Sequence, residues 1–423
     1  MLPPVRAYHR AVCLAGALLF LPAALAGQAS VPDRDPTVRR ALDLLRDQNA
    51  WTLEQQTSIC EIPAPPFSET RRGVELAARF RALGLVNVRT DSAGNVIGER
   101  PGSGGGRRVV LSAHLDTVFP ESTDVRVRRD GTRYRGPGIG DDCRGLAVML
   151  AVARAIGEAG TRARGDLVFV GTVGEEGPGN LRGVRYLFER GSAGRIDGFI
   201  SIDGTGLGLT SRAVGSHRYT VTIRGPGGHS YGDFGMPNPI HAIGRAIAAI
   251  GEFEVPASPR TTFNVGLIRG GTSVNSIPMS GAMDVDLRSE SQTALDSLDA
   301  ALRRAVASAV AAEQARWPAS SARLEAVWEV IGKRPAGAQP DEAPIVQAAI
   351  AAGRALGFSP RTSASSTDAN IPISLGVPAV TLDGGGRGDG AHSLSEWYDD
   401  GPEGWKGPQW ALLTVLMLAG WNR

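Results

Sequence analysis

Apolar runs and helical patterns alternate along most of this 423-residue chain. Residues 108–113, 166–173 and 198–203 are largely apolar, which is typical of strands that are covered on both faces. Apolar residues recur at helical spacing in a second set of segments, namely 36–49, 53–60, 68–83, 146–160, 343–356 and 410–421. Together with a strand at 379–382, this alternation predicts an α/β fold in which a mixed sheet is flanked by helices.

The pattern changes at about residue 212. A strand of alternating residues (216–224), a helix (239–250), two further strands (261–268 and 281–287) and an Ala-rich helix (293–315) follow one another. This order predicts a small two-layer α+β domain. We therefore expect an inserted domain at residues 212–326, and a first domain built from residues 33–211 and 327–423.

Residues that can bind a metal follow three of the predicted strands. His114 follows the first, Glu175 and Glu176 follow the second, and Asp203 ends the third. Open α/β sheets place their ligands at the carboxyl ends of strands, so we expect these side chains to meet. Two adjacent carboxylates repel each other unless a cation compensates them, so the glutamate pair indicates a metal site in which one acid is a ligand and the other carries a proton. The alternative is a solvated Glu-Glu-Gly turn.

Two loops bring further candidates. Asp141 and Asp142 precede the helix at 146–160, although the helix dipole alone would also favour acids there. His392 follows the Gly-rich loop at 384–390. Asp116, two residues after His114, is placed to orient the imidazole of that histidine.

The candidate metal ligands are two histidines and three carboxylates: His114, Asp141, Glu176, Asp203 and His392. Such a set suits two zinc ions with positions left open for water and substrate, and manganese or cobalt would accept the same ligands. Three carboxylates and a bridging hydroxide would balance the charge of two divalent ions, so the site can be buried without uncompensated charge.

These residues stand in motifs that resemble the M20 family of zinc metallopeptidases, which includes carboxypeptidase G-like enzymes, tripeptide aminopeptidases and acetyl-amino-acid deacylases. The resemblance covers nearly the whole chain after residue 26. It rests on the motifs His114-Leu-Asp-Thr-Val, Gly140-Asp-Asp with Gly145, Gly174-Glu-Glu-Gly, Ile202-Asp203, Gly227-Gly-His-Ser and Ala391-His-Ser. One departure is Cys143-Arg144 after the aspartates, where the family commonly has a Lys.

The resemblance implies a role for each ligand candidate. Asp141 would bridge both zinc ions, while His114 and Asp203 hold one ion and Glu176 and His392 hold the other. The enzyme would cleave an amide bond of a small peptide or an N-acyl amino acid. Its general base would be Glu175, which would carry a proton from the metal-bound water to the leaving nitrogen.

The inserted domain would act as a lid and as a dimerisation domain. By the same resemblance, His229 from a partner subunit would stabilise the oxyanion, which implies a homodimer. Asn275 and Arg288 would hold a carboxylate of the substrate, because a guanidinium fork beside an amide suits that group. The alternatives are that His229 is an exposed loop histidine, and that Arg288 pairs with Asp286 or Glu290 on the lid surface.

Two other functions fit parts of the pattern. An M28-like aminopeptidase would present a similar zinc set, but the inserted domain with its Gly-Gly-His motif argues against that class. A binding protein on an inactive, zinc-stabilised scaffold would have lost the base or a ligand, and none is missing here.

Charge and the first residues indicate where the protein works. The net charge is +2 and no block of Lys or Arg occurs, so neither nucleic acid nor an anionic membrane is an expected partner. Arg6 and Arg10 precede an apolar run at 11–25 that closes on a small-x-small cleavage signal. We expect a signal peptide at residues 1–26, and export to the periplasm or the medium without a membrane anchor in the mature form.

The chain has three cysteines. Cys13 would leave with the signal peptide, and Cys60 and Cys143 are too few for a disulfide framework. We expect Cys143 to be a spectator or a source of oxidative sensitivity that leaves the metals in place.

Overall fold

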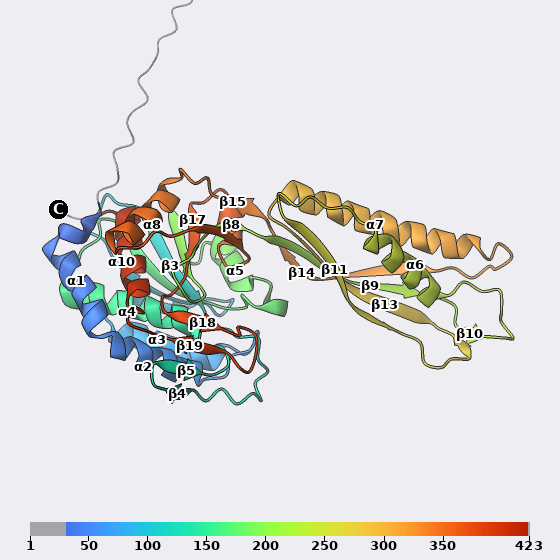
Figure 1. Ribbon diagram of the computed structural model, residues 1–423, viewed down its shortest axis with the longest axis horizontal. Coiled ribbons are helices and arrows are strands. Elements are labelled where there is room, and N and C mark those ends of the chain that lie inside the picture. The colour runs from blue at the N-terminus through green and yellow to red at the C-terminus, as the bar shows by residue number, and fades with distance from the viewer. Residues whose placement is uncertain (1–30, 422–423) are drawn as a thin grey trace, which may run out of the picture.

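The computed structural model describes residues 31–421, which form two bodies side by side along the long axis of the molecule (Figure 1). We call residues 31–213 and 335–421 the first body, and residues 214–334, which contain the elements from β9 to β14, the second body. The predicted signal peptide and Cys13 lie outside the described residues.

A nine-stranded mixed sheet is the centre of the first body. Its strand order is β1-β2-β6-β3-β7-β17-β8-β15, with β16 beside β8. The strands are β1 (Val86–Thr90), β2 (Val96–Arg100), β3 (Val109–His114), β6 (Leu167–Thr172), β7 (Gly198–Ile202), β8 (Leu209–Ala213), β15 (Gly337–Ala338), β16 (Thr362–Ser365) and β17 (Ala379–Leu382). Strands β6, β3, β7 and β17 run parallel, so their carboxyl ends share one edge.

Helices cover both faces of this sheet, which is why its central strands are apolar throughout. Val109 and Leu111 of β3 face one core together with residues of α1, α3, α4, α8 and α10, and Val110 faces the opposite core with α5 and α9. The helices are α1 (Pro36–Asp47), α2 (Asn49–Cys60), α3 (Thr70–Ala82), α4 (Cys143–Ala159), α5 (Arg182–Arg190), α8 (Pro344–Ala355), α9 (Asn370–Ser374) and α10 (Lys406–Ala419). The mixed α/β architecture expected from the sequence is confirmed.

The second body is a four-stranded antiparallel sheet with two helices on one face. Its order is β11-β13-β9-β14, and its elements are β9 (Gly215–Arg224), β11 (Thr261–Gly270), β13 (Ser280–Ser289), β14 (Glu325–Arg334), α6 (Pro239–Gly251) and α7 (Gln292–Ala315). A separate pair, β10 (Gly228–His229) and β12 (Ser276–Ile277), lies at the end that points away from the first body (Figure 1). The predicted boundary at residue 326 falls within β14, a strand that the sequence pattern did not indicate.

A small four-stranded sheet lies on the first body below the main sheet (Figure 1). It contains β4 (Arg128–Asp130), β5 (Arg133–Arg135), β18 (Arg387–Asp389) and β19 (Trp397–Asp399), in the order β18-β19-β5-β4. Two short 3-10 helices, η1 (Pro32–Arg34) and η2 (Gly177–Gly179), complete the regular structure of the described residues.

Cys60 and Cys143 form a disulfide, with 5.4 Å between their Cα atoms. The sequence alone does not indicate this pairing, because the two cysteines are 83 residues apart and only the packing of α2 against α4 brings the end of one helix to the start of the other. Cys143 is therefore a structural half-cystine in this fold and not a spectator thiol. None of the helices in the described part of the chain, α10 included, is both long enough and apolar enough to cross a membrane.

Candidate metal centre

Three adjacent strands end at the same edge of the main sheet, and each delivers a candidate ligand. His114 is the last residue of β3, Glu175 and Glu176 follow β6, and Asp203 follows β7. His114, Glu175 and Glu176 are almost completely buried. Because strands in this position are covered on both faces, their apolar residues fix the register and leave only the strand ends for polar chemistry.

The loop that carries Asp141 and Asp142 leads into α4. Asp141 points to the cluster, with its Oδ1 3.0 Å from His114 Nε2. Asp142 turns the other way, and its carboxylate accepts the backbone N–H groups of His114 (2.9 Å) and Gly145 (3.0 Å). A Cβ at Gly145 would lie 2.2 Å from Asp142 Oδ1, so only glycine allows this close approach. Asp142 thus ties the end of β3 to the start of α4.

His392 reaches the cluster from the loop between β18 and β19. Its Nε2 lies 2.9 Å from Glu176 Oε1 and 3.2 Å from Asp141 Oδ2. Its side chain is more than half exposed, in contrast to the buried carboxylates that it meets. His392 therefore forms the open side of the cluster.

The ligand candidates fall into two groups that share one residue. The donor atoms of His114, Asp141 and Asp203 lie within 4.8 Å of one another, and so do those of Asp141, Glu176 and His392. A third group of the same kind contains His114, Glu175 and Glu176. Each of the first two groups has one imidazole nitrogen and carboxylate oxygens, which is a donor set that suits zinc. The residues present therefore fit a centre of two divalent ions, because Asp141 belongs to both groups, and the role of each ligand stays a prediction.

The electrostatics of the cluster favour positive charge. Hydrogen bonds to Asp141 and Glu176 raise the pKa of His392 to about 10. Burial opposes protonation of His114, but its contacts with Asp116 and Asp141 raise the pKa of this histidine above its ordinary value. Burial raises the pKa of Asp203, and the neighbouring charge of Asp141 adds to that effect. A group of residues that attracts positive charge in this way has the property expected of a site for divalent cations.

Glu175 lies beside the two groups and has a cationic partner of its own. Arg334, the last residue of β14, donates from Nη1 to Glu175 Oε1 (2.9 Å) and from Nη2 to the Glu175 carbonyl oxygen. Burial raises the pKa of Glu175 to about 8, with Arg334 lowering it and Glu176 raising it further. A carboxyl group with a pKa near neutrality is suited to accept and release a proton.

Asp116 positions the glutamate pair more directly than it positions His114. Its carboxylate oxygens accept the backbone N–H groups of Glu175 (3.0 Å) and Glu176 (2.8 Å). His114 Nδ1 lies 2.9 Å from the carbonyl oxygen of Asp116 and 3.6 Å from its carboxylate. The imidazole is therefore oriented through the backbone of Asp116, and its carboxylate fixes the turn that carries the candidate base.

The candidates in the second body do not join the cluster within one chain. His229 and Asn275 lie beside each other, where Ser230 N donates to Asn275 O (2.9 Å), and both are exposed. Their strand pair is at the end far from the first body (Figure 1). Arg288 lies near the other end of β13, and its Nε donates to Asp286 Oδ2 (2.7 Å), the pairing that the alternative interpretation predicted.

Two buried arginines belong to the surroundings of the cluster and were missed in the sequence. Arg334 is the partner of Glu175, and Arg72 donates to the carbonyl oxygens of Ile62 and Leu115, the second of which lies between His114 and Asp116. Neither arginine follows a motif or a strand that the apolar pattern revealed. Only their burial, at 5% and 1% exposure, marks them, and burial of this kind cannot be seen in a sequence.

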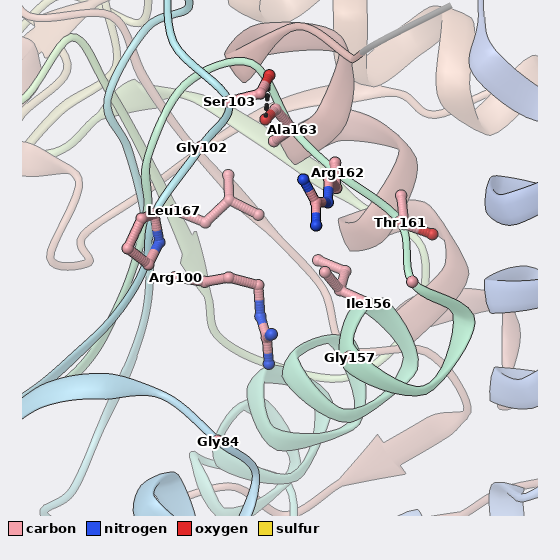
Figure 2. A pocket seen from close by; sticks show the side chains of 12 residues that line it. Gly84, Arg100, Gly102, Ser103, Ile156, Gly157, Thr161, Arg162, Ala163 and Leu167 are labelled. Atoms are coloured by element: carbon pink, nitrogen blue, oxygen red, sulfur yellow. Dashed lines mark hydrogen bonds between the residues drawn. The ribbon is translucent and has the colours of Figure 1, made fainter.

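A separate cavity of about 390 Å³ lies at the opposite edge of the main sheet, where β6 begins (Figure 2). It is lined by the end of α4, by residues 161–163 and by Arg100, whose Nη2 donates to the carbonyl oxygens of Leu83 and Ala153. The lining contains no histidine, cysteine or carboxylate, so this cavity is distinct from the metal centre.

Comparison with known proteins adds a family to this geometry. Residues 110–404 match the model of peptidase family M20/M25/M40. Carboxypeptidase G2 from Pseudomonas sp. (strain RS-16) is 27% identical over 284 residues, which cover 64% of this chain and 67% of that enzyme.

Solved structures support the same fold. Aminopeptidase PepT from Bacillus cereus superposes with a TM-score of 0.71 at 20% identity, covering 87% of this chain and 98% of that one. The Bacillus subtilis YXEP protein, a dinuclear metal-binding peptidase of the M20 family, superposes with a TM-score of 0.62 at 17% identity, covering 87% of this chain and 98% of that one.

Proposed function

Because the chain belongs to peptidase family M20/M25/M40, we propose that it is an exported two-zinc hydrolase that cleaves an amide bond of small peptides or N-acyl amino acids. The observation that carries the proposal is the pair of donor groups that share Asp141, with Glu175 beside them. The match to this family argues against an M28-like aminopeptidase, and the complete donor set with Glu175 beside it argues against a binding protein on an inactive scaffold.

Three residues beside the donor groups have separate roles in the proposed hydrolysis. Bound divalent ions would supply Lewis acidity and an activated water. Glu175 takes and returns the proton, because its carboxylate is buried beside the donor groups and is not needed by the two groups that share Asp141. Arg334 favours the ionised form of Glu175 and orients its Oε1. Asp116 holds the backbone of Glu175 and Glu176, so the base and its neighbouring ligand keep a fixed spacing.

A release assay on a substrate panel tests this function. Zinc-loaded protein would be incubated with dipeptides, tripeptides, N-acyl amino acids and N-carbamoyl amino acids, and the released amino acid would be quantified. We expect hydrolysis within at least one of these classes. No release from any class by protein that carries two ions per chain would contradict the proposal.

Two observations support export. The first 26 residues have the charge and apolar pattern of a signal peptide, and Cys60 is bonded to Cys143, which is typical of proteins that fold in an oxidising compartment. Protein recovered from the exported fraction is expected to begin near Gly27 and to contain no free thiol. Exported protein that retains Met1, shown by N-terminal sequencing, would contradict the predicted signal peptide.

We also propose a homodimer in which His229 serves the partner's site. The strand pair that contains His229 projects away from the first body of its own chain (Figure 1). Several large apolar side chains near that end are exposed, among them Tyr231, Phe234, Val274 and Met279. An exposed apolar surface of this kind favours contact with another protein surface.

A further inference from the structure

The turn with His392 and the loop with Asp141 reach the cluster without any strand of the main sheet. The small sheet brings them side by side, because Arg135 at the end of β5 pairs with Trp397 at the start of β19. The loop with Asp141 begins directly after Arg135, and the turn with His392 ends directly before Trp397. The backbone pairing of the small sheet therefore ends before it reaches Asp141 and His392, and other contacts must fix the distance between these two residues.

Glu396 spans this gap with its side chain. Its Oε2 accepts the backbone N–H of Gly138 (2.7 Å), and its Oε1 accepts those of Gly140 (2.8 Å) and Asp141 (3.0 Å). The carbonyl oxygen of Glu396 also accepts the N–H of Gly136 (3.1 Å). The side chain is 2% exposed, so without it three N–H groups of the loop would lose their partner in a buried place.

The other end of the same connection is the turn that carries His392. His392 has φ of 65°, a left-handed conformation that is unfavourable for a residue other than glycine. Such a conformation persists only where the surrounding structure holds it. The turn is closed by Ser393 Oγ donating to Gly390 O (2.7 Å) and by Glu396 N donating to Ser393 O (3.2 Å). Glu396 thus anchors the carboxyl end of the turn to the aspartate loop.

We infer that Glu396 is a positioning residue that holds His392 and Asp141 at the distance one metal ion requires, an inference that rests on the proposed two-metal function. Glu396 is not itself a ligand, because backbone N–H groups occupy both of its oxygens and it belongs to none of the donor groups. Only the donor group of Asp141, Glu176 and His392 takes a ligand from the turn. Loss of Glu396 should therefore lower the affinity of this group for its ion more than it lowers the affinity of the group of His114, Asp141 and Asp203.

The test measures metal binding directly. Cobalt and zinc would be titrated into metal-free wild type, Glu396→Gln and Glu396→Ala against a competing chelator, and the visible spectrum of bound cobalt would be recorded. Gln keeps the volume of Glu, but its amide N–H groups face Gly138 N–H and cannot accept from it. We expect two ions in wild type. In the variants the first ion should bind with wild-type affinity and the second about 10–100-fold more weakly, as is typical when a group that orients a ligand is lost.

A matched control separates positioning from general stability. Asp400 is a buried carboxylate of the same chain segment that accepts from Asn49 Nδ2 (2.6 Å) and Tyr398 Oη (2.9 Å). Asp400→Asn should bind both ions with wild-type affinity even if its thermal unfolding midpoint falls. Wild-type affinity for both ions in both Glu396 variants would overturn the inference, and so would parallel weakening of both ions in proportion to the loss of stability. Wild-type protein that binds no metal would instead overturn the proposed function, and this inference with it.

Discussion

The two bodies hold their candidate functional residues in opposite ways. In the first body the candidate residues are mostly buried, and most have a hydrogen-bonding partner, as Asp116 accepts from the backbone of Glu175 and Glu176. In the second body His229 and Asn275 are exposed, and their side-chain hydrogen bonds stay within their own turns. The first arrangement fixes its side chains by contacts within one chain. The second lacks such contacts with the first body of its own chain, and the proposed partner surface would supply them.

Metal removal should have the largest effect on activity. The donor groups that share Asp141 would hold the ions that supply the Lewis acidity of the reaction. Metal-free protein should therefore lose all hydrolysis, and added zinc or cobalt should restore it. The measurement is substrate release alongside elemental analysis of the same sample. Full turnover in protein without metal would contradict the proposed metal-dependent mechanism of the first body.

Replacing the candidate base should come next. Glu175→Gln removes the proton carrier and should lower kcat by about 10²–10⁴-fold while metal content stays at the wild-type level. Glu176→Gln, one residue away, should lower metal content instead, because this residue belongs to the donor group with His392. Turnover by Glu175→Gln within a few-fold of wild type would remove Glu175 from its role.

The second body is tested by mixing subunits. Removal of an oxyanion donor typically lowers kcat about 10²–10³-fold, so His229→Ala should be nearly inactive although it touches nothing in its own first body. Refolded together, His229→Ala and Glu175→Gln should regain part of the wild-type activity, since one site of the mixed dimer would contain both groups. Demonstrated heterodimers that stay inactive would show that His229 does not act across an interface.

Arg288 offers a smaller effect with a control on the same strand pair. If it selects the substrate carboxylate, Arg288→Ala should lower kcat/KM for free acids about 10-fold or more and leave amidated analogues unchanged, because a charge-assisted hydrogen bond is worth about 1.5–3 kcal/mol. Arg269 makes a comparable pair with Asp284, so Arg269→Ala should leave the ratio of acid to amide at the wild-type value. An unchanged ratio in Arg288→Ala would leave this arginine as a partner of Asp286 only.

The smallest effect concerns the one deeply buried histidine described in the second body, His217. Burial lowers its pKa below the ordinary value of 6.5, Lys333 adds to the shift, and Asp299 opposes it. The folded state then binds fewer protons than the unfolded state. The contribution of His217 to the free energy of unfolding is therefore fully present above about pH 6.5, and the free energy of unfolding falls as the pH drops, by at most about 1.4 kcal/mol per pH unit.

Urea unfolding between pH 5 and 7.5 would measure this slope. His217→Gln should flatten it. A wild-type slope that survives in His217→Gln would assign the pH dependence to other groups.

The sequence predicted those parts of the molecule that local pattern controls. Apolar runs gave β3, β6 and β7, and the rule that parallel strands share a carboxyl edge brought His114, the glutamate pair and Asp203 together. Contacts between residues far apart in the sequence could not be predicted. The partner of Glu175 is Arg334, 159 residues further along, and Glu396 bonds a loop 255 residues before it. Neither contact follows from periodicity, because each depends on how complete elements pack.

The bond between Cys60 and Cys143 has a consequence for the unfolded chain. It closes a loop across 83 residues, and His114 and Asp141 both lie inside that loop. A closure of this length lowers the entropy gained on unfolding by an amount worth about 4–5 kcal/mol in the chain-entropy model. It also shortens the average distance between two candidate ligands, His114 and Asp141, in the unfolded chain. In a chain that is oxidised early in folding, both side chains would therefore be closer to a bound zinc ion than in a reduced chain. Metal binding and folding would then favour each other.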